Sequence, residues 1–247
     1  MKLIKRLLLL ILIIIIIVAS FIIYNGYAMY KNAVSKISLQ DKISSIRNDS
    51  NFVSINEVPK YYLEAIIAVE DHRYREHGAI DIISIGRAFV SNVQAKELNE
   101  GGSTITQQVA KNLYFITEEN FVYRKIAEVF LAFDLENKYS KNEILELYFN
   151  TIYFGEGYYG IKEAAQGYYE KEPKDLTLYE ATMLAGIPNA PSVYAPTINP
   201  DLAKSRQGKV IRSMIEYSYL TQEEADKIIK WCNVDVSFCI IYPFYIT

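Results

Sequence analysis

The 247-residue chain is poor in the residue types on which several common kinds of site depend. It contains two cysteines, Cys232 and Cys239, and no Cys/His set stands near them. They fit no zinc pattern and can form at most one disulfide, so they say little about the compartment. The Gly-x4-Gly-Lys-Ser/Thr order of a P-loop is also missing.

An excess of charge of one sign is missing as well. The formal net charge is −3 and the sequence pI is about 5.6. A protein that wraps a polyanion with its whole surface needs a strong positive excess, so we expect no nucleic acid partner. The chain has 51% apolar residues and only seven prolines. This composition excludes disorder for most of the chain. The length suits one packed domain, alone or with an appendage.

One long apolar run lies at the amino terminus. The residues from Leu7 to Ile23 are apolar apart from Ser20, and three basic residues precede them. Extended to Tyr24, the run makes a helix of roughly 27 Å, close to the ~30 Å hydrocarbon core of a bilayer. The basic flank holds the N-terminal end in the cytoplasm and places the rest of the chain outside.

Residues 1–30 are therefore predicted to be a cytoplasmic tip and an uncleaved transmembrane anchor. Tyr24, Tyr27 and Tyr30 follow at helical spacing and suit an interfacial aromatic belt. A cleaved signal peptide is the alternative, because Gly26-Tyr27-Ala28 resembles a small-x-small cleavage site, but its apolar core would exceed the usual ~7–15 residues. A buried core helix is a third reading, although globular helices rarely lack a polar face.

Beyond the anchor the pattern is mainly helical. Residues 31–52 are polar and predict a stalk or a short linking helix, residues 53–218 predict a packed domain, and residues 219–247 predict a C-terminal helix and tail. No alternating strand pattern persists outside that tail. Pairs with S/T-x-x-E spacing predict capping boxes: Ser140 with Glu143, Thr177 with Glu180, and Thr221 with Glu224. The predicted helices are Val58–Glu70, Asp81–Leu98, Thr104–Tyr114, Phe121–Tyr139, Lys141–Asn150, Gly157–Tyr169, Leu178–Gly186 and Asp201–Ser218.

Three segments carry residues suited to chemistry. Glu70 stands where an apolar helix leaves the core, and a carboxylate partly shielded by apolar neighbours can act as a general base near neutrality. A solvated helix end is the plainer reading. The glycines before Ser103 and Thr104 free the backbone to approach a ligand, and N–H groups at such a helix start attract phosphate oxygens. A simple capped turn would look the same. Taken alone, Arg124 and Glu128 are a surface ion pair worth ~0.3–0.5 kcal/mol.

The order of these segments is more specific than any one of them. The chain contains, in sequence, Glu70-Asp71-x-x-Tyr74-x-x-His77-x-x-x-Asp81, then Glu100-Gly101-Gly102-Ser103-Thr104-Ile105-Thr106-Gln107-Gln108-x-x-Lys111-Asn112, then Arg124-Lys125-x-x-Glu128, then Tyr139-Ser140-Lys141-x-Glu143-Ile144-Leu145-Glu146-x-Tyr148-x-Asn150, then Tyr153-Phe154-Gly155-x-Gly157, and finally a stretch from Glu180 to Pro196. This series resembles the peptidoglycan glycosyltransferases of family 51, over about Val53 to Met214.

The resemblance implies a reaction and roles. Family members join lipid II units: the 4-hydroxyl of an acceptor sugar attacks the anomeric carbon of a growing chain that is anchored by polyprenyl diphosphate. By similarity, Glu70 is the base that removes the acceptor proton. Diphosphate is a stable anion that needs cations and N–H donors rather than an acid. The substrate-binding residues implied are Asp71, Ser103, Thr104, Gln107, Gln108, Lys111, Asn112, Arg124 and Lys125.

The resemblance also implies the surroundings of the reaction. Glu128 would orient the cations or share a divalent ion, Mg²⁺ or Mn²⁺, with the diphosphate, and no cofactor is obligatory. The implied fold is mainly α and lysozyme-like, with a smaller membrane-proximal lobe around Ile82–Asn99. Expected partners are lipid II, the growing glycan chain, the bacterial cell membrane and other cell-wall synthesis proteins. An anchor beside the domain fits, because the substrate's lipid stays in the bilayer.

Two positions depart from the family pattern, and one family module is missing. Tyr74 stands where the family usually has Phe, and Asn120 stands where an Arg or Lys often precedes the Arg-Lys pair. No Ser-x-x-Lys and no Lys-Thr-Gly occurs. The expectation is a monofunctional glycosyltransferase without a transpeptidase domain.

Two other classes of function share some of these features. A lytic muramidase would have a similar helical core and a single catalytic glutamate. The basic, amide-rich segment from Ser103 to Lys125 argues against it, because a neutral polysaccharide gives the cations nothing to pair with. A non-catalytic scaffold of the division or elongation machinery is disfavoured because the candidate site residues are intact: Glu70, Lys111, Arg124 and Glu128.

Overall fold

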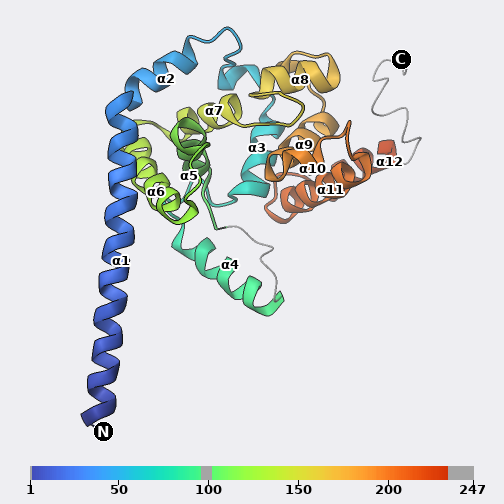
Figure 1. Cartoon of the computed structure of the whole chain (residues 1–247). Helices are drawn as coiled ribbons and strands as arrows, with labels where there is room; N and C mark the ends of the chain where they lie inside the picture. Colours follow the sequence, from blue (N-terminus) through green and yellow to red (C-terminus); the bar gives the residue numbers. More distant parts are fainter. Residues whose placement is uncertain (1, 96–101, 233–247) are drawn as a thin grey trace.

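The structure is a computed structural model that describes residues 2–95 and 102–232, and it is built from helices (Figure 1). The predicted mainly α fold is confirmed: in the described part of the chain no strand forms, and the one β-bridge joins Tyr153 to Tyr159. The apolar tail beyond residue 233 lies outside the described residues. The α-helices are α1 (Lys2–Lys36), α2 (Leu39–Arg47), α3 (Lys60–Glu70), α4 (Ile82–Ala95), α5 (Ile105–Ala110), α6 (Phe121–Lys138), α7 (Lys141–Thr151), α8 (Ile161–Tyr169), α9 (Leu178–Gly186), α10 (Pro191–Tyr194), α11 (Pro200–Glu216) and α12 (Gln222–Cys232).

The predicted capping boxes fix where three of these helices begin. Ser140 before α7 and Thr177 before α9 each accept a hydrogen bond from the backbone three residues later, and the glutamates there accept one in return. Thr221 and Glu224 exchange the same pair of bonds before α12. Each box satisfies two N–H groups that would otherwise lack a partner.

The core forms around α3, which packs against α9 and α11. Tyr62, Ala65 and Ile66 of α3 are buried because the helix carries apolar side chains on most of its surface. On another side of the core, α5 packs against α6 and α7. The C-terminal end of α3 therefore lies between α5 and α11, and this is where Glu70 stands.

α1 is one continuous helix with two different environments. Most apolar side chains before Gly26 are exposed, and α1 is the one described helix that is long and apolar enough to cross a membrane, by length and composition. From Gly26 onward α1 runs beside α6 (Figure 1). The rings of Tyr27 and Tyr30 lie 5.1 and 5.9 Å from that of Phe130, so two of the three predicted belt tyrosines pack on the domain.

The segment predicted to be a stalk or linking helix is helical and packed. Leu39 and Ile43 of α2 are buried because they lie four residues apart on one face of the helix. Arg47 also forms an ion pair of 2.9 Å with Glu143 of α7. The predicted smaller lobe corresponds to α4, where Ile82 and Ile83 are exposed. In Figure 1, α4 extends from the body toward the same end as the N-terminal half of α1.

Candidate active site

A pocket of about 810 Å³ opens where the end of α3 meets α5, α6 and α11. Seven of the eleven predicted site residues line it: Glu70, Asp71, Ser103, Gln108, Lys111, Lys125 and Glu128. Residues that are 58 positions apart in the sequence, Glu70 and Glu128, thus share one cavity. The predicted grouping of two carboxylates with cations and amides is present in the structure.

Glu70 is the last residue of α3, and its carboxylate is held from two sides. The helix ends because Asp71 leaves helical geometry, with φ −162° and ψ 73°. Gln108 Nε2 donates to Glu70 Oε2 at 2.9 Å, and Arg206 Nη2 donates to Oε1 at 3.2 Å. The carboxylate therefore faces the pocket in a fixed orientation.

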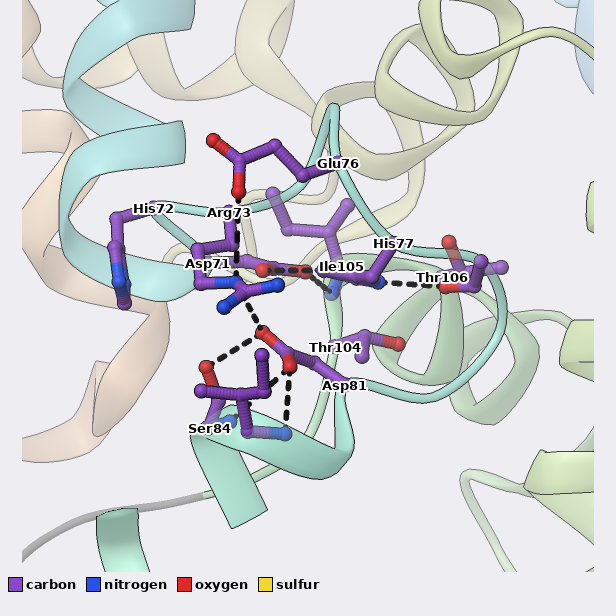
Figure 2. Close-up of polar contacts among 12 residues, drawn as sticks. Asp71, His72, Arg73, Glu76, His77, Asp81, Ser84, Thr104, Ile105 and Thr106 are labelled. Carbon is purple, nitrogen blue, oxygen red and sulfur yellow. Dashed lines mark hydrogen bonds and ion pairs between the residues drawn. The ribbon is translucent and has the colours of Figure 1, made fainter. Parts of the chain in front are cut away.

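Asp71 binds the protein itself, as Figure 2 shows. Its Oδ2 accepts the Ile105 backbone N–H at 3.0 Å, and its Oδ1 lies 2.7 Å from His77 Nε2. Burial lowers the pKa of His77, but the hydrogen bond and charge of Asp71, together with the Gly78 carbonyl, outweigh burial and raise it. Asp71 thus joins the turn after Glu70 to the start of α5, which carries Gln108.

Asp81 has a matching structural position at the start of α4 (Figure 2). It accepts hydrogen bonds from the backbone of Ile83 and Ser84 and pairs with Arg73 at 3.3 Å. Burial raises the pKa of Asp81, but the Ser84 hydrogen bonds and the charge of Arg73 outweigh burial and hold that pKa below its ordinary value. Polar atoms of Asp71, His77 and Asp81 lie within 4.8 Å of one another. Their existing hydrogen bonds do not fit a metal ion, because coordination would break them.

The part of the pocket wall that α6 supplies carries a carboxylate that binds two cations. Glu128 is 1% exposed. Lys125 Nζ donates to Glu128 Oε2 at 2.7 Å and to Ser103 Oγ at 2.8 Å, and Arg124 Nε lies 3.4 Å from Oε1. Both Glu128 oxygens contact cations here, and the role of Glu128 as a divalent-ion ligand stays a prediction. The geometry matches the other expectation, that Glu128 orients the cations.

Lys111 completes this cationic wall. Burial lowers its pKa, Arg124 and Lys125 lower it further, and Glu128 and Glu70 act in the opposite direction. The three cations stand close enough to repel one another. An anionic ligand placed between them would relieve that repulsion, which makes this wall suited to an anion.

Four predicted site residues do not line the pocket. Thr104 and Gln107 form the capping box of α5, and Thr104 Oγ1 also donates to the Ala79 carbonyl at 3.1 Å. Arg124 donates to the Glu118 carbonyl at 3.2 Å besides its contact with Glu128. The Asn112 side-chain amide nitrogen is buried and has no hydrogen-bond partner among the described residues. A binding role for these four, as for the seven residues that line the pocket, remains a prediction.

The sequence reasoning missed the α11 wall of the pocket. Arg206, Lys209 and Arg212 line it at a spacing of three, which places them on one side of the helix. At the end of α11, Tyr217 stacks on His72 with ring centroids 4.2 Å apart and planes 12° apart. The spacing of the basic residues was a usable signal, but a charged stripe on a helix is more often a solvated face.

The structure explains both departures from the family pattern. Tyr74 is fully buried, and its hydroxyl donates to the Lys141 carbonyl at 2.7 Å, so the extra oxygen has a partner. Asn120 is the N-cap of α6, where its side chain accepts the Tyr123 backbone N–H at 3.0 Å. An asparagine is favoured at such a position for that reason.

A family model described as Transglycosylase matches residues 39–215. The chain belongs to the transglycosylase family. The match begins inside the segment predicted to be a stalk, in agreement with the packing of α2. It includes every residue of the pocket except Glu216 and Tyr217.

Two curated relatives of this transglycosylase agree with that membership. The chain is 47% identical over 197 residues to penicillin-binding protein 1F of Bacillus subtilis (strain 168), covering 78% of this chain and 28% of that protein. It is 46% identical over 179 residues to penicillin-binding protein 1A of Neisseria flavescens, covering 72% and 22%. A crystal structure of penicillin-binding protein 1A from Haemophilus influenzae aligns at 24% identity and a TM-score of 0.44, covering 72% of this chain and 17% of that chain. The chain thus spans about a quarter of the length of its curated relatives.

Proposed function

We propose that this transglycosylase polymerises lipid II into β-1,4-linked glycan strands and releases polyprenyl diphosphate. The observation that carries the proposal is the pocket itself, in which the Glu70 carboxylate faces a wall formed by Lys111, Lys125 and Glu128. A base and a cationic diphosphate site within one cavity are the two requirements of glycosyl transfer from a diphosphate donor.

In the proposed reaction, Glu70 accepts the proton of the acceptor 4-hydroxyl while that oxygen forms a bond to the anomeric carbon of the donor. The bond from this carbon to the diphosphate oxygen breaks, and the electron pair leaves with the diphosphate. Lys111 and Lys125 stabilise the charge that develops there, as preorganised cations do. Gln108 fixes the carboxylate, and Glu128 fixes Lys125. No step needs a metal ion bound by these residues.

The membrane arrangement follows from the substrate. The exposed apolar half of α1 would cross the cytoplasmic membrane with its N-terminus inside, and the catalytic domain would lie outside. α1 would then hold the pocket close to the bilayer from which the lipid-linked donor and acceptor enter. Binding of other cell-wall synthesis proteins remains an expectation from the family.

The test is polymerisation of labelled lipid II in vesicles by the purified full-length protein. We expect glycan strands to form, with one polyprenyl diphosphate released for each glycosidic bond. A muramidase would instead release reducing ends from purified sacculi, and a scaffold would do neither. Release of reducing ends without lipid II consumption would overturn the proposal.

A further inference from the structure

Glu70 is paired with a guanidinium that lies 136 positions later in the chain. Arg206 Nη2 donates to Glu70 Oε1 at 3.2 Å, and the two side chains are 12% and 9% exposed. A carboxylate in this state is poorly placed to act as a base, because accepting a proton would break the ion pair. The contact therefore calls for a change before the proposed reaction.

The Arg206 side chain is fixed as far as Nε, whereas its terminal guanidinium nitrogens, here called the head, make few contacts. Its Nε donates to the Gly186 carbonyl at 3.1 Å, and a Cβ on Gly186 would stand 3.0 Å from Arg206 Cγ. The head meets Glu70 through one nitrogen and lies 5.9 Å from the centroid of the Tyr194 ring. Nη1 has no hydrogen-bond partner among the described residues. Rotation of the head can change its partner without moving α11.

The surroundings of Arg206 favour an anion with several charges. Lys209 and Arg212 line the same side of the pocket, and Glu216 is the acidic residue on that wall. Phosphate oxygens accept two parallel hydrogen bonds from a guanidinium, which is a stronger arrangement than the single contact with Glu70. A diphosphate in the pocket would therefore compete with Glu70 for Arg206.

We propose that Arg206 exchanges partners: it pairs with Glu70 in the free protein and moves to a substrate diphosphate on binding, which frees the carboxylate to accept a proton. The inference rests on the proposed function of Glu70. The exchange would couple diphosphate binding to release of the Glu70 carboxylate, so that the base becomes available when the pocket holds substrate.

The test is an equilibrium titration of the full-length protein in detergent with inorganic diphosphate, followed by calorimetry. The charge of Glu70 is removed by Glu70→Gln in three backgrounds: the native chain, Arg206→Gln and Lys209→Gln. Lys209 is the matched control, because it shares the wall and has no contact with Glu70. In the native and Lys209→Gln backgrounds, we expect Glu70→Gln to tighten diphosphate binding about fivefold or more, because Arg206 is no longer held. In the Arg206→Gln background this gain should fall to near unity.

An equal gain in all three backgrounds would overturn the exchange, because the carboxylate would then act through its field alone. No gain in the native background would overturn it as well. Arg206→Lys keeps the charge, so Glu70→Gln should tighten diphosphate binding more in the Arg206→Lys background than in the Arg206→Gln background. Equal gains in these two backgrounds would contradict the proposal. Unfolding temperatures check that each variant is folded. The titration measures binding and needs no turnover. The partner exchange can therefore be disproved while loss of polymerisation in Glu70→Gln still supports Glu70 as the base, and the reverse also holds.

Discussion

Gly26 of α1 lies directly against Ile126 of α6, so that a Cβ on the glycine would stand 2.5 Å from the Ile126 side chain. α6 also carries Lys125 and Glu128, which face the pocket. The helix that positions the cations is therefore packed against the continuation of the apolar N-terminal segment. This contact ties the geometry of the pocket to the direction of α1.

Gly26→Ala tests that close approach. The added methyl group should push α1 from α6 and lower the free energy of unfolding by about 1–3 kcal/mol, since packed interfaces respond to overpacking in this way. Gly86→Ala in α4 is the matched control, because nothing lies within 4 Å of its Cβ position. The free energy of unfolding of Gly86→Ala should rise by roughly 0.4–1 kcal/mol. Thermal unfolding in detergent measures both, and a gain for Gly26→Ala would contradict the packing.

Truncation separates the two parts of α1. Removing Met1–Tyr24 should leave the unfolding temperature nearly unchanged, because the lost side chains are exposed. Removing Met1–Tyr30 should cost roughly 2–4 kcal/mol more, because Tyr27 and Tyr30 leave the Phe130 ring. Both forms should turn over lipid II in vesicles more slowly than the full chain. Equal unfolding temperatures for the two truncations would contradict the docking of α1.

The contrast between Gly26 and Glu70 shows what the sequence can predict. Glu70, Lys111 and Glu128 were predicted because the ordered motifs that contain them resemble those of a known family, whereas the local pattern around each had a plainer reading. The docking of Gly26 on Ile126 was missed because nothing local marks a contact across 100 positions. Arg206 was missed although its spacing with Lys209 and Arg212 was a signal, because its partner Glu70 is known only once α3 and α11 are packed.

His77 gives a pH dependence of stability. Its pKa is raised in the folded protein above the ordinary value of 6.5, so the protonated pair with Asp71 adds stability that is fully present below that value. This stability is lost as the pH rises through the raised pKa. His77→Gln should therefore cost more unfolding free energy near pH 5.5 than near pH 9, by urea titration. Burial and Arg87 lower the pKa of His72. Because His72 is present in the native chain and in His77→Gln, its contribution cancels in the comparison. A cost independent of pH would contradict the pairing.

Asn120→Arg has two opposing effects. Loss of the N-cap should cost about 1 kcal/mol of stability, because the Tyr123 N–H loses its acceptor. The added charge at this helix start should tighten inorganic diphosphate binding if Asn120 borders the diphosphate. Asn120→Ser keeps a capping oxygen and serves as the control. Unchanged stability of Asn120→Arg would show that the cap contributes little.

Glu70 is proposed to be the base of a glycosyl transfer, and the most direct test is the rate of lipid II polymerisation by Glu70→Gln in vesicles. The amide keeps the shape and the Gln108 contact but accepts no proton, so the rate should fall by at least about 10²–10⁴-fold while inorganic diphosphate still binds. Glu128→Gln is the contrast, because loosening Lys125 should weaken binding and turnover together. Polymerisation by Glu70→Gln at a rate near that of the native chain would contradict the account.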